Sequence, residues 1–417
     1  MTDATLFTGV SELVQPHAAE TSTRSPVDVI HDAALLASGG KLLAAGPRGS
    51  VETHPDAKLA TVVDLGGRAV VPGLVDSHTH VLFAGNRIDE MSRRARGETY
   101  ETIQRAGGGI LRSVAPLRAA SIDELVRQTR PRLDAMLSRG TTTIEAKSGY
   151  GLSAEAELKH LRAIRALAPH TPIDVLSTLL AHVIPQEARN HRRAYVDEFC
   201  RSIIPEAARQ NLAQFCDIFV EGVAFTPDET RQIAAAARAV GLGIKLHVDQ
   251  LEDGGGAKLA AELRALSADH LEFTGIDGRL ALAKGRVAAT ILPGCALFLG
   301  RGPWPDGRGL REAGCEVAVA TDCNPGSSML TDLGLCATVA TTRCGLSLEE
   351  ALWAVTKGGA RALGLADRGR LVAGELADFV VVDDPDWRAL FYWPGDALLS
   401  RVFKSGQCVW PAPASPK

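Results

Sequence analysis

Two histidines stand two residues apart in the segment Asp76-Ser77-His78-Thr79-His80. In an extended chain, side chains i and i+2 point to the same side, so both imidazoles can reach one metal ion. Residues of the same chemical kind follow further along the chain: His182, His247, His270 and Asp322. Imidazole nitrogens combined with a carboxylate suit a divalent or trivalent first-row ion. The pattern therefore indicates chemistry on a bound metal.

Apolar, strand-like runs alternate with helical segments through the middle of the chain. The runs are 69–76, 141–147, 173–181, 215–221, 243–249, 267–272, 287–292 and 316–322. Several helix starts fit the capping-box pattern of Ser or Thr with Glu three residues later: Ser121 with Glu124, Thr226 with Glu229, and Ser347 with Glu350. Eight strands that alternate with helices predict a parallel (β/α)8 barrel, because each parallel connection needs a crossover.

A doubly wound open sheet is the alternative fold. No G-x-G-x-x-G motif follows an early strand, which argues against the dinucleotide-binding version of that sheet.

In a barrel, active sites form at the carboxyl ends of the strands. The candidate residues fall there: His78 and His80 on strand one, His182 on three, His247 on five, His270 on six and Asp322 on eight. Each residue alone is a weak signal, since a lone histidine is more often a core residue and an aspartate often caps a helix. Together they predict one metal site. The other histidines are expected on the surface: His17, His31, His54, His160, His170 and His191.

Both ends of the chain are β-rich. Residues 34–46 form two apolar runs around Gly39-Gly40, a hairpin signal, and 62–71 repeat this pattern around Gly66-Gly67. Similar strand-like apolar runs occur near the C-terminus, at 375–384 and 401–410. We predict a small composite β-sandwich domain of residues 1–68 plus 365–417, beside a barrel of residues 69–364. Two unrelated β-appendages are the alternative.

Composition excludes several classes of protein. The 417 residues are 46% hydrophobic and 23% charged, as in an ordinary globular protein. A net charge of -4 gives no global attraction to nucleic acid or to an anionic membrane, so neither is expected as a partner. The N-terminus lacks the features of a secretory signal, and none of the eight cysteines forms a C-x-x-C pair. We therefore expect reduced cysteines and a cytoplasmic location.

Several segments resemble the amidohydrolase superfamily. These are PGLVDSHTH at 72–80, the histidines of strands five and six, the aspartate of strand eight and GELADFVVVD at 374–383. Finer motifs are similar to the imidazolonepropionase family within it: VLFAGNRIDE at 81–90, AGGGIL at 106–111, TTTIEAKSGYGL at 141–152, KLHVDQ at 245–250, GGAKLA at 255–260, SADHLE at 267–272 and TDCNPGS at 321–327. The resemblance spreads over most of the chain.

This resemblance implies a catalytic centre with one zinc or iron ion per subunit, bound by His78, His80, His247 and Asp322. Activated water would open the ring of 4-imidazolone-5-propanoate to yield N-formimino-L-glutamate. Asp322 would move the proton of that water, His270 would hold Asp322 or the nucleophile in line, and His182 would polarise the carbonyl. Strand four ends in Glu221 with no lysine there, so a carbamylated lysine between two ions is not expected and the centre should be mononuclear.

The propanoate tail of that substrate calls for a cation, and Arg87 matches the substrate-binding arginine of the family. We expect its partner carboxylate to belong to the substrate. Further positions match contacts to substrate or product: Tyr150, His182, Gln250, Asn324, Gly326 and Ser327, with Tyr100 as a weaker candidate. Gln250 stands where some members carry Glu, so it should hydrogen-bond the ring, and Cys323 stands where a bulkier residue is frequent. A homodimer is expected.

Two other functions stay open. A deaminase of cytosine, guanine or a similar ring could use the same metal cage, but it should lack Arg87 and needs a proton-shuttling carboxylate near Gln250. A non-catalytic scaffold on a degenerate barrel would normally have lost metal ligands, and none is missing here.

Overall fold

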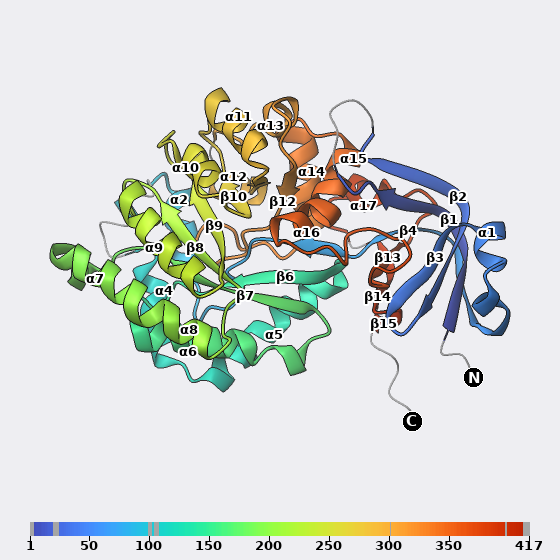
Figure 1. Cartoon of the computed structure of the whole chain (residues 1–417), viewed down its shortest axis with the longest axis horizontal. Helices are drawn as coiled ribbons and strands as arrows, with labels where there is room; N and C mark the ends of the chain where they lie inside the picture. The colour runs from blue at the N-terminus through green and yellow to red at the C-terminus, as the bar shows by residue number, and fades with distance from the viewer. Residues whose placement is uncertain are drawn as a thin grey trace.

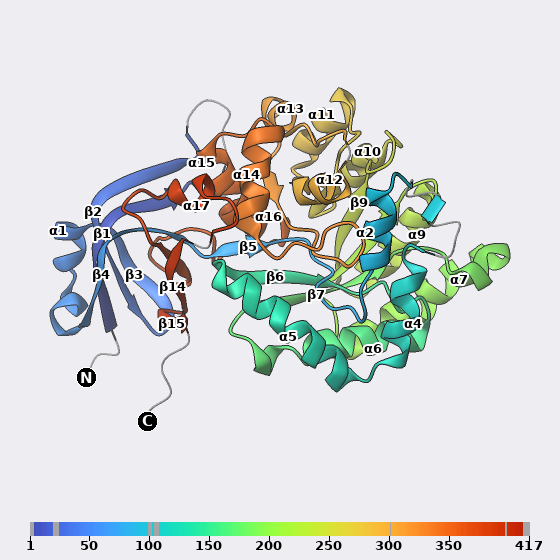
Figure 2. The same cartoon turned by 180° about the vertical axis from the view of Figure 1, so that it is seen from behind.

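A computed structural model describes residues 4–19, 25–98, 102–103, 108–300, 302–396 and 398–411. An eight-stranded sheet is wrapped into a barrel with helices around it, and a seven-stranded sheet stands at one side (Figure 1). Figure 2 shows from behind that the first and the last strand of the chain both lie in this second sheet.

The barrel strands follow each other in chain order, and each pairs in parallel with the next. They are β5 (Leu74–Asp76), β6 (Thr141–Lys147), β7 (Asp174–Ala181), β8 (Phe215–Val220), β9 (Gly243–Val248), β10 (Ser267–His270), β11 (Ala288–Ile291) and β12 (Val317–Val319). The predicted barrel is confirmed. The expected first strand at 69–76 is wrong in its first half, because Ala69–Pro72 pair with the terminal sheet instead.

The first and last strands meet through their ends. Thr79 and Cys323 form a parallel bridge, and His80 donates its backbone N–H to the carbonyl of Cys323 at 2.9 Å. The buried carboxylate of Asp76 accepts hydrogen bonds from the Thr321 backbone N–H at 3.0 Å and from its hydroxyl at 2.6 Å. These contacts close the barrel.

Helices cover the barrel from outside. They are α2 (Ile88–Ala95), α4 (Leu111–Ala119), α5 (Ile122–Ser138), α6 (Ala154–Arg165), α7 (Arg192–Glu198), α8 (Ile204–Arg209), α9 (Pro227–Ala239), α10 (Gly256–Glu262), α11 (Ile276–Gly285), α12 (Pro293–Leu299), α13 (Gly307–Glu312), α14 (Leu333–Arg343), α15 (Leu348–Trp353) and α16 (Gly359–Ala362). Short 3₁₀ turns cover Ala168–His170 and Gln186–His191, and π-helical turns cover Phe199–Ile203 and Ala354–Gly358.

The helix starts expected from the sequence are present. Thr226 and Ser347 form complete capping boxes with Glu229 and Glu350, and the Ser121 hydroxyl accepts the backbone N–H of Glu124. In the described part of the chain, no helix is long and apolar enough to cross a membrane.

The second sheet joins strands from both ends of the chain. Its order is β15-β14-β13-β4-β1-β2-β3, with only the pair β1–β4 parallel. The strands are β1 (Ala4–Pro16), β2 (Val27–Ser38), β3 (Lys41–Pro47), β4 (Thr61–Pro72), β13 (Phe379–Val382), β14 (Leu399–Lys404) and β15 (Gln407–Trp410). Three short helices accompany it: α1 (Arg48–Glu52), a 3₁₀ turn (Pro55–Leu59) and α17 (Ala389–Tyr392). The expected composite β-unit is thus one hydrogen-bonded sheet, whereas the limits of the two domains stay a prediction.

One hairpin expectation is confirmed and one is wrong. Gly39 and Gly40, with φ of +57° and +80°, turn the chain between β2 and β3. Gly66 and Gly67 also have positive φ, but they lie inside β4, where the register against β1 shifts. Because β4 is paired on both sides, by β1 and by β13, Gly66 and Gly67 form a bulge in a continuous strand and not a turn between two strands.

The core of the terminal sheet is an aromatic cluster from both ends of the chain. The rings of Phe379 and Phe403 stack with centroids 4.4 Å apart, and Phe7 meets Phe379 edge-on at 5.0 Å. Because Phe7 comes from β1 and the other two from β13 and β14, this cluster ties the termini together.

We expect Phe379→Ala to lower the free energy of unfolding by about 3–5 kcal/mol, because it leaves a cavity among buried aromatic rings. Tyr392→Ala is the matched control, since Tyr392 is 74% exposed and its loss should cost less than about 0.5 kcal/mol. Urea denaturation of both variants measures this, and equal stabilities would contradict a packing role for the cluster.

Candidate metal centre and active site

The expected metal ligands converge at one end of the barrel. His78 and His80 follow β5, His247 lies in β9, and Asp322 follows β12. Asp322 Oδ1 lies 3.7 Å from His78 Nε2 and 3.6 Å from His80 Nε2. His247 Nε2 lies 3.4 Å from His80 Nε2. His78, His80 and Asp322 therefore offer ligand atoms that all lie within 4.8 Å of one another, and His247 adjoins them through His80.

The spacing of these atoms fits a metal ion. A tetrahedral ion with ligand distances of about 2.1 Å separates neighbouring ligand atoms by about 3.4 Å, close to the observed values. Among the described residues, the buried Nε2 of His78 has no hydrogen-bond partner, which suits a nitrogen that binds a cation.

The protonation of the site also suits a metal. Burial lowers the pKa of His78, His80 and His247 well below the ordinary value, and nearby cationic groups add to the shift. The imidazoles are therefore neutral, as metal binding requires. Burial raises the pKa of Asp322 to about 6.

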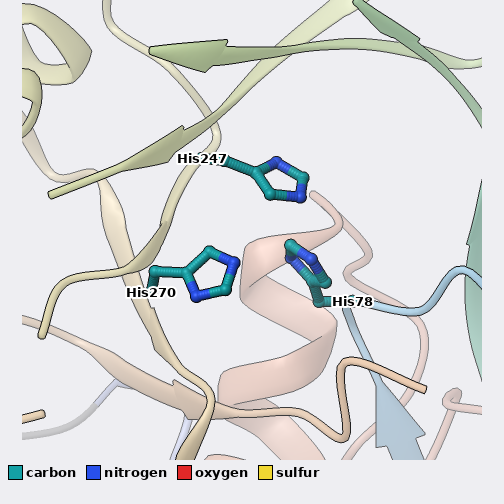
Figure 3. Close-up of side chains that lie close together, drawn as sticks. All are labelled: His78, His247 and His270. Carbon is teal, nitrogen blue, oxygen red and sulfur yellow. The ribbon is translucent and has the colours of Figure 1, made fainter. Parts of the chain in front are cut away.

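His270 faces the same space. Figure 3 shows the rings of His78, His247 and His270 around one another, and the ligand atoms of these three lie within 4.8 Å of each other. Burial alone would lower the pKa of His270, but the carboxylates of Glu272 and Asp322 outweigh it and raise that pKa. His270 can therefore hold a proton beside Asp322.

The backbone is strained where the strands end at this space. Asp249, His270 and Asp322 have φ of 52°, 87° and 53°, in the left-handed region that side chains other than glycine rarely adopt. Such residues gather at functional sites, where the surrounding fold holds them in place.

A tight turn after Asp322 fixes that carboxylate. The Asn324 amide donates to the backbone carbonyl of Asp322 at 2.7 Å, and its carbonyl oxygen accepts the backbone N–H groups of Gly326 and Ser327, each at 2.8 Å. The Ser327 hydroxyl donates to Asp322 Oδ2 at 3.4 Å. The predicted residues Asn324, Gly326 and Ser327 are thus placed next to the metal ligand.

Arg87 lies inside the protein, at the start of α2, against this turn. A Cβ at position 326 would overlap with its guanidinium, so glycine leaves the room that Arg87 needs. Nε and Nη2 of Arg87 donate to Glu90 Oε2 at 2.9 and 2.7 Å, and Glu90 Oε1 accepts the Gly109 backbone N–H. The expectation that only the substrate supplies a carboxylate to Arg87 is wrong, because buried Glu90 already neutralises it.

His182 and Tyr150 lie beside the candidate ligand His80. The His182 ring stacks near His80 with centroids 5.7 Å apart, and Tyr150 lies 5.8 Å from His182. Burial lowers the pKa of His182 to about 4, although its contact with the Gly149 carbonyl opposes this. The loop that carries Tyr150 is tied by Glu157, which accepts the backbone N–H groups of Gly149 and Gly151.

A cavity of about 190 Å³ has Gln250, Glu272 and Cys295 in its wall. Glu272 Oε1 lies 3.5 Å from His270 Nδ1, so the cavity borders the centre. The backbone N–H of Gln250 donates to Glu221, which therefore shapes the loop. Cys323 is buried in the apolar core, away from this cavity wall.

The sequence reasoning missed a layer of charged side chains beneath the ligands. Its members are fully buried: Glu145, Lys147, Asp217, Lys245 and Asp269. Burial by itself lowers the pKa of Lys147, but Asp217, Glu145 and Asp269 outweigh it and raise that pKa. The available signal was a charge at an inward-facing position of an otherwise apolar strand, as in FCDIFV at 215–220.

Two further residues that were singled out in the sequence are His160 and Tyr100. His160 was expected on the surface but is buried in α6, because it faces the barrel, where its Nε2 lies 3.0 Å from the Leu82 carbonyl oxygen. Tyr100 lies outside the described residues.

Known proteins are similar to this chain over nearly its whole length. A sequence profile of the amidohydrolase family matches residues 88–409. An imidazolonepropionase from Deinococcus radiodurans is 45% identical over 404 residues, which cover 96% of this chain and 98% of that protein. An imidazolonepropionase from Rubrobacter xylanophilus is 47% identical over 383 residues, covering 91% of each chain.

Solved structures share the fold at low identity. An atrazine chlorohydrolase from Arthrobacter aurescens TC1, in complex with zinc, has a TM-score of 0.73 at 19% identity and covers 97% of this chain and 94% of its own. A zinc-bound adenosine deaminase from Xanthomonas campestris has a TM-score of 0.64 at 18% identity and covers 97% of this chain and 92% of its own. With its barrel, its metal-binding geometry and these relatives, the chain belongs to the amidohydrolase family and, within it, to the imidazolonepropionases.

Proposed function

We propose that this protein hydrolyses 4-imidazolone-5-propanoate to N-formimino-L-glutamate, a step of histidine degradation, with water activated by one zinc or iron ion. The single observation that carries this is the convergence of three histidines and an aspartate, as candidate metal ligands, with an arginine buried beside them. The names and high identity of the relatives support the same reaction.

His78, His80, His247 and Asp322 would hold the ion. When bound, it lowers the pKa of a coordinated water from about 15.7 towards 7 and so supplies a nucleophile at neutral pH. Asp322 would accept the proton of this water through its carboxylate, and protonated His270 would keep that carboxylate in line.

The ring carbonyl would lie between the nucleophile and His182, whose imidazole can donate a hydrogen bond to the oxygen as negative charge develops there. Water adds to the carbonyl carbon, the lactam C–N bond breaks, and Asp322 returns its proton to the leaving nitrogen. Tyr150 and Gln250 would contact the ring, and the turn Asn324–Ser327 would hold the substrate near Asp322.

Arg87 would bind the propanoate carboxylate. Glu90 uses the Nε and Nη2 side of the guanidinium, while Nη1 faces Gly326 and the turn beside Asp322. A fixed guanidinium loses little freedom on binding, so a partner already in place favours recognition of a second carboxylate.

A ring deaminase is the second candidate, and one observation favours it. Such an enzyme needs a carboxylate near Gln250, and Glu272 lies in the wall of the same cavity. Arg87 argues for ring opening instead, because nucleobases carry no carboxylate tail. Cytoplasmic location, a homodimer and the choice between zinc and iron stay predictions.

Metal removal should abolish activity and lower the thermal midpoint. Binding to the folded state alone stabilises it by about 4 kcal/mol at a metal concentration 1,000 times Kd. Differential scanning fluorimetry with and without added zinc measures this. His78→Ala should lose the metal-dependent shift, whereas the control His31→Ala, on the exposed surface of the terminal sheet, should keep it. An unchanged shift in His78→Ala would contradict the ligand assignment.

Replacement of Arg87 should weaken use of the tailed substrate. Because Arg87→Met alone leaves Glu90 buried without its partner, the better variant is Arg87→Met/Glu90→Gln. We expect kcat/KM to fall by roughly 10²–10³-fold with metal content unchanged. Arg231→Met, at an exposed ion pair on α9, is the control and should keep wild-type kinetics. Near-normal kinetics in the double variant would remove Arg87 from the site.

Product analysis separates the two candidate reactions. With imidazolonepropionate we expect formiminoglutamate, and with guanine or cytosine we expect no ammonia. Imidazolone without the propanoate should be a very poor substrate, since it cannot make the proposed contact between the propanoate and Arg87. Rapid ammonia release from a nucleobase, with no turnover of imidazolonepropionate, would overturn the assignment in favour of the deaminase.

A further inference from the structure

The buried charged layer beneath the ligands comes from four strands of the barrel. Glu145 and Lys147 lie on β6, Asp217 on β8, Lys245 on β9 and Asp269 on β10, and all five side chains are fully buried. Such burial is costly for charged groups unless they are paired. We therefore infer that the charged layer does more than fill the interior of the barrel.

Two carboxylates of the layer contact metal-binding histidines from below. Asp269 Oδ2 is hydrogen-bonded to His78 Nδ1 at 2.7 Å, whereas Asp217 Oδ2 lies 3.0 Å from His247 Nδ1 without the alignment of a hydrogen bond, so a small turn of that ring would complete the second pair. A carboxylate at Nδ1 places the ring proton there and leaves Nε2 free to bind a metal. In both rings Nε2 is the atom turned towards the other ligands.

Lys147 meets both of these carboxylates. Its Nζ lies 2.6 Å from Asp217 Oδ2 and 3.7 Å from Asp269 Oδ2, and it also contacts Glu145 Oε2 at 2.7 Å. The oxygens that face Lys147 are the same oxygens that face the two histidines. One ammonium group thus lies at the junction of both carboxylate–histidine pairs.

We propose that Lys147 is a positioning residue of the metal centre: it holds Asp217 and Asp269 where they orient His247 and His78 towards the ion. This rests on the metal site of the proposed function, but it concerns metal binding and needs no particular substrate. Without Lys147, the carboxylates repel each other and turn away from the rings, so the histidines lose their fixed orientation.

The sign of the effect distinguishes positioning from simple charge. The layer has three carboxylates and two ammonium groups, and Lys147→Met makes it more negative by one charge. If the layer acted only through its charge, the variant would bind a cation more tightly. Positioning predicts the opposite, a loss of about 10–100-fold in metal affinity.

The experiment measures metal affinity directly. The metal-free full-length proteins compete with a chromophoric chelator for Zn²⁺, and the visible spectrum of the Co²⁺ form reports ligand geometry. We expect Lys147→Met to bind Zn²⁺ about 10–100-fold more weakly and to show an altered Co²⁺ spectrum. Wild-type or tighter affinity with an unchanged spectrum would overturn the proposal.

Lys245→Met is the matched control. Lys245 is equally buried and pairs with Glu145 at 3.1 Å and with the Ser77 carbonyl at 2.9 Å. It lies 3.8 Å from Asp269, about as far as Lys147 does, so the two lysines differ in the 2.6 Å pair that Lys147 forms with Asp217. Lys245→Met should lose stability as Lys147→Met does, with a clearly smaller loss of affinity. Equal losses in both variants would show a general effect of removing a buried ammonium and would overturn the proposal.

A charge-matched variant covers the case in which Lys147→Met does not fold. Lys147→Met/Asp217→Asn has the same net charge in the layer as the wild type, and its affinity for Zn²⁺ should still be weakened. Wild-type affinity in this variant would contradict the proposal. If the wild-type protein binds Zn²⁺ but does not open imidazolonepropionate, the proposed function fails while the role of Lys147 stands or falls on its own measurement.

Discussion

Closure of the barrel between its first and last strands creates the metal centre. His78 and His80 follow β5, Asp322 follows β12, and the Thr79–Cys323 bridge with the Asp76–Thr321 hydrogen bonds brings these two segments together. Because His78, His80 and Asp322 each lie one residue from the bridge, a small shift in register would separate them. The rest of the site depends on this contact.

The second requirement is a balance of buried charge. A cation-binding site inside a barrel gathers carboxylates and neutral imidazoles in a region that excludes water, and each uncompensated charge there is costly. Lys147 and Lys245 offset most of the carboxylates of the layer below. Glu90 offsets Arg87 in the same way beside the turn that follows Asp322. Buried ion pairs thus organise the site, and each pair also restricts the rotation of its two side chains.

Backbone strain and close packing complete the organisation. His270 and Asp322 hold left-handed conformations that are unfavourable by themselves, and hydrogen bonds from Asn324 and Ser327 stabilise the second of them. Gly326 has no side chain at the point where Arg87 passes, so the arginine proposed to bind the substrate tail and the candidate ligand Asp322 meet at one short turn. The terminal sheet, tied by Phe7, Phe379 and Phe403, contributes none of these side chains.

The order of strands, the barrel and the convergence of the candidate ligands at one end of it could be predicted from the sequence, because apolar runs and the residues that follow them are local features. His78 and His80 still follow the first barrel strand although β5 begins at Leu74, because the expected and the observed strand both end at Asp76. The bulge of β4, the buried position of His160, the pairing of Arg87 with Glu90 and the place of Lys147 between two histidine-bound carboxylates could not be read in this way. Each depends on which groups meet across the fold, as Lys147 does with Asp217, 70 positions away. The local sequence pattern carries no information on contacts between residues that are far apart in the chain. These contacts are determined only when the strands pack into the barrel.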